Sequence, residues 1–160
     1  MSAIQSLSLR DRISDFQADY IRCIDHDELE RWPDYFVPDC HYSVTTAANQ
    51  HDGLAAGLIW ANNQAMLHDR VSALRNANVY ERQAYRHILS QASISTPSTA
   101  GIPAETPFLV VRIMHDGITH LFMTGIYQDV FVETDAGLRL KSRVVVLDSS
   151  RIDTLLAIPL

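Results

Sequence analysis

The most reactive-looking stretch of the sequence places Asp39, Cys40, His41 and Tyr42 side by side. A cysteine beside a histidine is typical of a nucleophile with its base, or of half a metal site. Residues 40–46, CHYSVTT, alternate in polarity, which predicts a β-strand. Because adjacent strand residues point to opposite faces, Cys40 and His41 are not expected to act together.

Metal and nucleophile motifs are otherwise sparse. A Rieske cluster needs two Cys-x-His pairs, and a zinc site needs closely spaced ligands, whereas the only other cysteine is Cys23. The chain contains no G-x-S-x-G motif and no glycine-rich phosphate loop. Five histidines are expected to be solvated or hydrogen-bonded near helix ends, loops or turns: His26, His51, His68, His115 and His120. We therefore expect no catalytic, cofactor-binding or metal-binding residue in this chain.

A second group of residues could catalyse a reaction only if the fold brought its members into one pocket. A histidine base, a carboxylate that orients it and tyrosine donors could serve a dehydratase or isomerase. The members of this alternative pocket are Asp25, Tyr42, Tyr85 and His87, with Arg70 as a further donor. The competing interpretation is a filled interior, in which His87 and Arg86 bond to backbone and carboxylates.

Two charged steps, Asp69-Arg70 and Arg86-His87, adjoin apolar residues. Charged residues beside apolar ones often lie on a solvated face. Partly buried arginines that bond to carboxylates would instead hold loops or subunit contacts in place. These four residues are therefore candidates for structural or interface roles.

Composition limits the class of protein. At 160 residues the chain is expected to form a single domain, residues 1–160, large enough to bury a core without disulfides or metal. The net charge of −6 and the lack of a Lys/Arg cluster lead us to expect no nucleic-acid partner, because phosphate binding needs positive charge. No apolar run is long enough to cross a bilayer, and the N-terminus lacks signal-peptide features, so we expect a cytoplasmic protein without membrane contact.

Helices are predicted in the first half of the chain. Apolar residues recur at helical spacing from Leu9 to Ile24, and Ser8 could serve as N-cap. A short second helix is expected around Leu29 to Phe36, limited by prolines. A longer helix is predicted from roughly Trp60 to Arg75, after a loop at residues 47–53.

Strands dominate the second half. A strand is expected to begin near Tyr85, followed by a loop over residues 96–107, and then by three consecutive antiparallel strands from residue 108 to 149. Helices first and strands afterwards is the α+β order. The predicted fold is a cystatin-like, or nuclear-transport-factor-like, cone, in which N-terminal helices pack in a curved antiparallel sheet.

The last hairpin predicts a register. A three-residue loop at 135–137 would place Asp129 opposite Arg143 and Glu133 opposite Arg139. One face would then be semi-polar and is our candidate for a subunit contact, because aromatic and arginine side chains often anchor interfaces: Tyr127, Asp129, Phe131 and Arg143. The other face is expected to meet the helices: Ile126, Val130, Val132, Leu140, Val144 and Val146. The apolar ending LLAIPL is expected to lie against the core or a neighbour.

Residues 51–90 also resemble a known family. The step Asp69-Arg70-Val71, followed by a linker and Arg86-His87, is similar to the small (β) subunits of Rieske non-haem iron aromatic-ring-hydroxylating oxygenases. The opening helix that leads to Trp32, Tyr35, Phe36 and the segment 39–42 is similar as well. The resemblance extends from about Phe16 to the end of the sequence.

The resemblance implies a non-catalytic, assembling subunit with the cone fold. It implies a trimer of this chain beneath a trimer of large (α) subunits, which carry a Rieske [2Fe–2S] cluster and mononuclear Fe(II). It further implies electrons from NAD(P)H through a separate reductase or ferredoxin, and an aromatic carboxylate substrate such as terephthalate, salicylate or anthranilate. Two other hypotheses stay open: a stand-alone cone-fold dehydratase or isomerase that uses His87, and a ligand-binding or scaffolding homo-oligomer.

Overall fold

The computed structural model describes residues 7–54, 57–76, 80–152 and 156–160. Its helical elements are α1 (Leu9–Asp25), the 3-10 helix η1 (Leu29–Tyr35), α2 (Ala47–His51) and α3 (Gln64–Asn76). Its strands are β1 (Phe36–Thr46), β2 (Ile59–Ala61), β3 (Gln83–Leu89), β4 (Ser93–Ile94), β5 (Ile102–Met114), β6 (Thr119–Thr134) and β7 (Gly137–Leu147).

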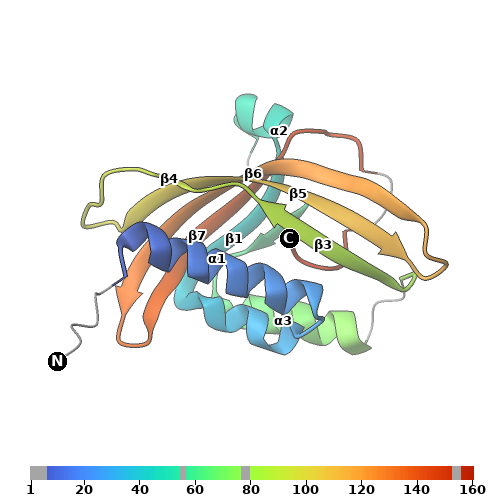
Figure 1. The fold of residues 1–160 in the computed structure, drawn as a ribbon, viewed down its shortest axis with the longest axis horizontal. Coiled ribbons are helices and arrows are strands. Elements are labelled where there is room, and N and C mark those ends of the chain that lie inside the picture. The colour runs from blue at the N-terminus through green and yellow to red at the C-terminus, as the bar shows by residue number, and fades with distance from the viewer. Residues whose placement is uncertain (1–6, 55–56, 77–79, 153–155) are drawn as a thin grey trace.

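The strands form one curved sheet in the order β2-β1-β7-β6-β5-β3, with β4 paired to β5. The helices α1 and α3 lie along one side of this sheet, and the sheet bends around them (Figure 1). The predicted cone is therefore confirmed. The sheet is mixed rather than wholly antiparallel, because β1 runs parallel to β7.

The first helix forms as the sequence pattern predicts. Ser8 caps α1, since its Oγ accepts a hydrogen bond from the backbone N–H of Asp11 at 3.1 Å. The stripe that includes Ile13, Tyr20 and Ile24 is buried. Amphipathic spacing thus decides which side of α1 faces the sheet.

Several element boundaries differ from the predictions because of local caps and sheet pairing; the strand expected at 40–46, for example, begins at Phe36. The expected loop at 47–53 contains α2, whose N-cap Thr46 accepts from the N–H of Asn49 at 3.1 Å. The helix expected from Trp60 begins only at Gln64, and Trp60 lies in β2, paired with Ser43. The expected loop at 96–107 becomes strand β5 from Ile102 onward, because β6 supplies pairing partners there.

The hairpin of β6 and β7 confirms half of the predicted register. Asp129 does pair with Arg143, but Glu133 pairs with Leu138 instead of Arg139. The register shifts between Val130 and Phe131, so one residue of β7 is accommodated as a bulge. The last pair before the turn is Thr134 with Gly137, so the hairpin loop has two residues instead of the predicted three.

The two faces of this hairpin are reversed relative to the prediction. The semi-polar set Tyr127, Asp129, Phe131 and Arg143 is buried inside the cone, at 0%, 3%, 0% and 0% exposure, so it cannot form the proposed subunit contact. The apolar set around Ile126, Val130 and Val144 is only partly buried. The physical reason is that α1 presents polar as well as aromatic groups to the sheet, and these satisfy the buried charges. Leu140 alone of its expected set is fully buried, because the bulge restores it to the inner face.

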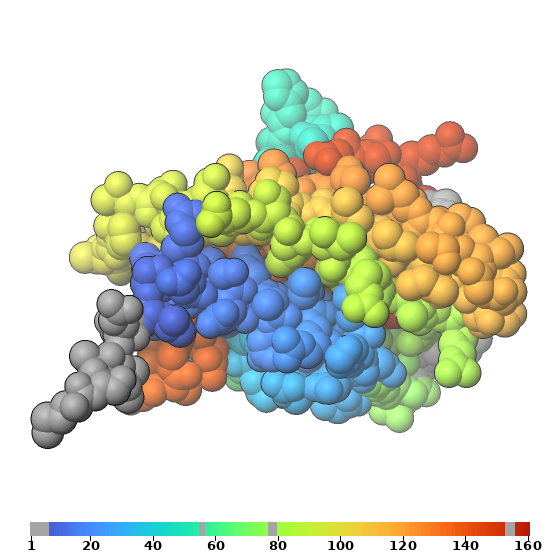
Figure 2. All heavy atoms as spheres, in the orientation of Figure 1, coloured from blue at the N-terminus to red at the C-terminus, as the bar shows by residue number. Residues whose placement is uncertain are grey.

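The space-filling view shows how the layers close over one another. Atoms of α1 run across the front of the molecule and meet those of the β3–β4 region, while α2 projects away from both (Figure 2). The concave interior is thus covered on this side by α1. The buried polar groups described next lie between α1 and the sheet.

Candidate functional site: the polar interior of the cone

Arg143 is the centre of a buried polar network. Its Nε and Nη2 atoms each donate to the Asp129 carboxylate at 2.8 Å, and Nη2 also donates to Gln17 Oε1 at 2.5 Å. Gln17 in turn donates from Nε2 to Asp129 Oδ2 at 3.0 Å and to Thr106 Oγ1 at 3.2 Å. The network ties β7 and β6 to helix α1, with both charged side chains fully buried.

Aromatic rings enclose the Arg143 guanidinium. Its central carbon lies 4.1 Å from the ring centroid of Tyr20 and 4.0 Å from that of Tyr127, which is cation–π geometry. Burial acts to lower the pKa of Arg143, but the charge and hydrogen bonds of Asp129 outweigh it, and the pKa ends above its ordinary value. The guanidinium is therefore a permanent cation inside the cone.

Asp25 and His87 form a second buried pair. His87 Nδ1 lies 2.6 Å from Asp25 Oδ1, and the backbone N–H of His87 donates to Asp25 Oδ2 at 3.0 Å. The pair joins the end of α1 to the middle of β3. His87 Nε2 is buried without a hydrogen-bond partner among the described residues.

The alternative pocket is only partly assembled. The rings of Tyr85 and His87 lie close, with centroids 6.0 Å apart. A surface pocket of about 400 Å³ is lined by Asp25, Tyr85 and Ile158, among others. Tyr42, however, bonds to the C-terminal segment rather than to His87. The structure thus brings Asp25, Tyr85 and His87 together and commits Tyr42 elsewhere.

The C-terminal segment Leu156–Leu160, which we call the LAIPL segment, lies inside the cone. The hydroxyls of Tyr20 and Tyr42 donate to the backbone oxygen of Leu160 at 3.0 and 3.2 Å. Arg70 of α3 donates from Nη2 to the Leu156 carbonyl at 3.0 Å. The expectation that LLAIPL lies against the core is confirmed for the described residues 156–160, since Leu156, Ala157, Ile158 and Leu160 are buried.

The remaining candidates lie on the surface or apart. Asp69 and Arg86 are exposed, so neither belongs to the interior network. Cys40 is buried, while the His41 ring bonds to Asn62 and Ser43 on the other side of β1, which confirms that the two residues do not act together. In the described part of the chain, no group of three or more His, Cys, Asp or Glu side chains could hold a metal ion.

Sequence reasoning missed Gln17 and Tyr20 as partners of Arg143. Gln17 lies four residues after Ile13 and three before Tyr20, on the buried stripe of α1, and is itself only 4% exposed. A polar residue on an otherwise apolar stripe indicates a buried polar partner elsewhere. That signal predicts a partner but not its identity.

None of these groups forms a reaction centre with an open site for substrate. The buried charges are paired, and the tyrosine hydroxyls Tyr20 and Tyr42 are engaged by the LAIPL segment. Among the described residues, no helix is long and apolar enough to cross a membrane. Most of the buried polar atoms named above are hydrogen-bonded, while His87 Nε2, the Tyr127 hydroxyl and Arg143 Nη1 have no hydrogen-bond partner among the described residues.

Comparisons with known proteins place this geometry in a family. Residues 5–144 match the SnoaL-like domain. The chain is 51% identical over 149 residues to a β subunit of the terminal oxygenase component of terephthalate 1,2-dioxygenase from Comamonas sp, covering 93% of this chain and 97% of that protein. It is 41% identical over 141 residues to the small subunit of anthranilate 1,2-dioxygenase from Burkholderia cepacia, covering 88% of each.

A solved structure agrees with the sequence matches. The β subunit of an aromatic-ring-hydroxylating dioxygenase from Novosphingobium aromaticivorans superimposes with a TM-score of 0.86 at 39% identity, covering 94% of this chain and 96% of that one. These relatives favour a dioxygenase subunit over a stand-alone dehydratase or isomerase. The chain therefore belongs to the SnoaL-like domain family and, within it, to the β subunits of aromatic-ring-hydroxylating dioxygenases.

Proposed function

We propose that this chain is the structural β subunit of a terminal oxygenase that hydroxylates an aromatic carboxylate. The observation that carries the proposal is the 51% identity, over 93% of the chain, with a subunit of a terephthalate dioxygenase. Terephthalate and anthranilate, named in the relatives, are both aromatic carboxylates. We infer the substrate class from the substrates named for these relatives, because we assign the substrate pocket itself to the α subunit.

The redox centres are assigned to a large α subunit. A Rieske cluster is held by two cysteines and two histidines, and a mononuclear iron site by two histidines and a carboxylate. The adjacent Cys40 and His41 point to opposite faces of β1 and do not fit such a ligand set. In the proposed complex, the α subunit holds both centres and receives electrons from NAD(P)H through a reductase or ferredoxin in the cytoplasm.

The face of the sheet opposite α1 and α3 is the proposed contact between copies of this chain. Across β6 and β7 this face carries a band of partly buried apolar residues, namely Ile126, Val130, Val132 and Val144. Pairing of Ile126 with Pro107 and with Val146 extends the band onto β5 and across β7. Polar side chains share this face, since Gln128 lies opposite Val144 and Arg139 lies opposite Val132. Each copy carries a net charge of −6, so the apolar part of the face is where copies meet with least repulsion. A trimer of this chain beneath three α subunits would cover it.

Co-expression with the α subunit tests the assembly. The expected product is a complex of both chains, with a mass that corresponds to three copies of each, measured by light scattering after size-exclusion chromatography. A chain that stays monomeric and binds no Rieske-containing partner would contradict the proposal.

A substitution locates the contact. Val144→Asp places a charge in the apolar band and should release monomers, because an unpaired charge is costly to bury in an interface. Leu7→Asp is the matched control, since Leu7 is 59% exposed and precedes α1. Circular dichroism checks that both variants fold. If Val144→Asp assembles like the control, the band is not the contact surface.

A further inference from the structure

A ring of three copies needs two different contact surfaces on each copy. A surface that meets its own equivalent in a second copy is related to it by a two-fold axis, so it joins two copies and no more. Around a three-fold axis, one surface of each copy meets a different surface of the next copy. The proposed trimer therefore needs a second surface that receives the apolar band around Val144.

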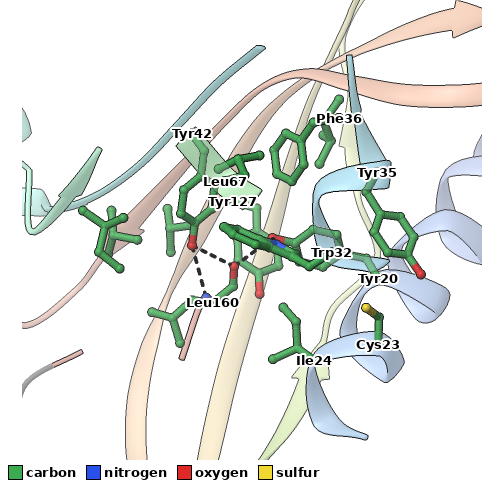
Figure 3. Close-up of a cluster of buried hydrophobic side chains, with 14 of the residues drawn as sticks. Tyr20, Cys23, Ile24, Trp32, Tyr35, Phe36, Tyr42, Leu67, Tyr127 and Leu160 are labelled. Carbon is green, nitrogen blue, oxygen red and sulfur yellow. Dashed lines mark hydrogen bonds between the residues drawn. The ribbon is translucent and has the colours of Figure 1, made fainter. Parts of the chain in front are cut away.

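The inner face of the sheet is already covered and cannot supply that surface. Figure 3 shows the side chains of Trp32, Tyr42 and Leu160 gathered together inside the cone, and all three are fully buried. A neighbouring copy that contacts the sheet must therefore use its outer face, which is opposite α1 and α3 (Figure 1).

A second apolar surface lies on the outer face of β3, β5 and β6. It consists of Ile88, Leu109, Val111 and Leu121, and we call it the Leu121 patch. Val111 pairs with Leu121 on one side and with Arg86 on the other, while Leu109 pairs with Ile88, so these side chains share one face. Leu121 is 68% exposed and Ile88 is 54% exposed, so both are accessible to another molecule.

The Leu121 patch and the Val144 band lie at different places on the outer face. On β6, Leu121 precedes Gln128, the residue opposite Val144, by seven positions. At about 3.3 Å per residue, these two places are roughly 23 Å apart along the strand. They are therefore separate surfaces of one copy, and a rotated neighbour can bring one against the other.

The band adjoins a hollow that suits a projecting side chain. A surface pocket of about 270 Å³ lies beside Val144 and α2, and its lining includes Leu54. Thr45 also lines this α2 hollow and is only 8% exposed, yet its Oγ1 has no hydrogen-bond partner among the described residues. Figure 1 shows α2 well apart from the turn between β5 and β6, near which Leu121 lies. The outer face thus has a recess at one place and an exposed leucine at another.

Opposite charges accompany the recess and the exposed leucine. Asp52 follows α2 directly and precedes Gly53, which lines the hollow, and Arg86 lies in the same cross-strand row as Leu121. Both charged side chains are exposed, and neither belongs to an ion pair within the part of the chain that the structure describes. Since copies with a net charge of −6 repel one another, a contact that brings Arg86 to Asp52 of the next copy is favoured.

We propose that the copies meet head to tail, with the Leu121 patch of one copy on the Val144 band and the α2 hollow of the next. Arg86 then faces Asp52 across the contact. The inference rests on the proposed trimer and adds the surface that completes it. Because every copy carries both surfaces, closing the ring covers all of them. The occupant of both surfaces is thus another copy of this chain.

Leu121→Asp tests the patch in the complex co-expressed with the α subunit. Light scattering should show loss of the mass of three copies of each chain, as for Val144→Asp, because an unpaired charge is costly to bury. Ile118→Asp is the matched control and should assemble normally, since Ile118 is 54% exposed but lies at the turn between β5 and β6, outside the patch. Circular dichroism checks that each variant folds.

A charge reversal identifies the molecule that the patch meets. Arg86→Asp places two carboxylates together across the contact, and Asp52→Arg places two guanidinium groups together. Each should raise the concentration for half-assembly about tenfold, because like charges in a contact repel. The double variant should restore assembly, since opposite charges face each other again.

Arg82→Asp is the matched control for the charge reversal. Arg82 is exposed and lies near Arg86 in the sequence but outside the patch. Its substitution should leave assembly unchanged, and it should not correct the defect of Asp52→Arg. These variants also keep the inference testable if Leu121→Asp does not fold.

Two results would overturn the inference. One is a Leu121→Asp complex that assembles like the Ile118→Asp control. The other is a pair of charge reversals that has no effect singly, or that the double variant does not correct, as expected if the patch meets the α subunit. Failure of the proposed function looks different, because the unsubstituted chain then forms no complex with three copies of each chain. If that complex forms and Val144→Asp releases monomers, only the head-to-tail geometry is at stake.

Discussion

The buried pair of Asp129 and Arg143 makes a quantitative prediction. Replacing Asp129 by alanine leaves the Arg143 guanidinium buried, with Gln17 as its remaining hydrogen-bond acceptor in this network. Two unit charges about 4 Å apart attract by roughly 4 kcal/mol at an effective dielectric constant of about 20. Breaking a buried pair by removing one partner costs about 3–5 kcal/mol for the same reason. Asp129→Ala and Arg143→Met should each lower the free energy of unfolding by that amount.

The double variant should cost much less than the sum of the two. With both charges removed, no uncompensated charge stays buried, and methionine fills most of the volume of the arginine side chain. The expected coupling free energy is about 2–3 kcal/mol. Urea unfolding followed by circular dichroism measures it, from midpoints at constant slope.

An exposed ion pair in the same molecule supplies the comparison. Arg12 and Glu133 lie 2.6 Å apart with side chains 36% and 53% exposed. Their double-mutant cycle should give a coupling below about 1 kcal/mol, because water and salt screen exposed pairs. Additive effects at Asp129 and Arg143, or a coupling no larger than that of the exposed pair, would refute the assignment of the interior network.

Two further predictions concern buried groups. His87→Ala should lower the free energy of unfolding by roughly 2–5 kcal/mol, because the buried Asp25 loses the imidazole and keeps only the backbone N–H of residue 87. An assembled, iron-loaded complex should keep near-normal turnover, and lost turnover in an intact complex would contradict the structural role. Burial raises the pKa of Cys23 to about 11 and also raises that of Cys40. The folded chain therefore keeps the Cys23 thiol neutral at pH values where the unfolded chain loses the proton. The stability that this gives is complete below the pKa of the thiol in the unfolded chain and is lost as the pH rises toward 11. Iodoacetamide at pH 8, followed by mass spectrometry, should label both cysteines in urea and neither in the folded chain.

Local patterns in the sequence were sufficient for the elements that depend on near neighbours. The cap at Ser8, the apolar stripe of α1 and the alternation that separates Cys40 from His41 were all predictable. The pairing of Asp129 with Arg143 followed from counting back from the turn. These features follow from fixed helical and strand periods over a few residues.

The limits of that counting are physical. The bulge between Val130 and Phe131 shifts the register at Glu133, and no local signal marks where a long strand will bend. A face that reads as semi-polar became the interior because Gln17 and Tyr20, more than a hundred residues away in sequence, satisfy Arg143. Periodicity defines two faces, but only the partner across the core decides which one is buried.

The family and the α+β order could be predicted from the amino-acid sequence, because they depend on residue types at short spacing and on resemblance along the chain. Which side chains meet in the interior became evident only from the folded chain. Asp25 meets His87 across 62 positions, and Tyr20 meets Leu160 across 140. Hydrogen bonds over such separations depend on how the sheet curves around α1, which no local pattern specifies.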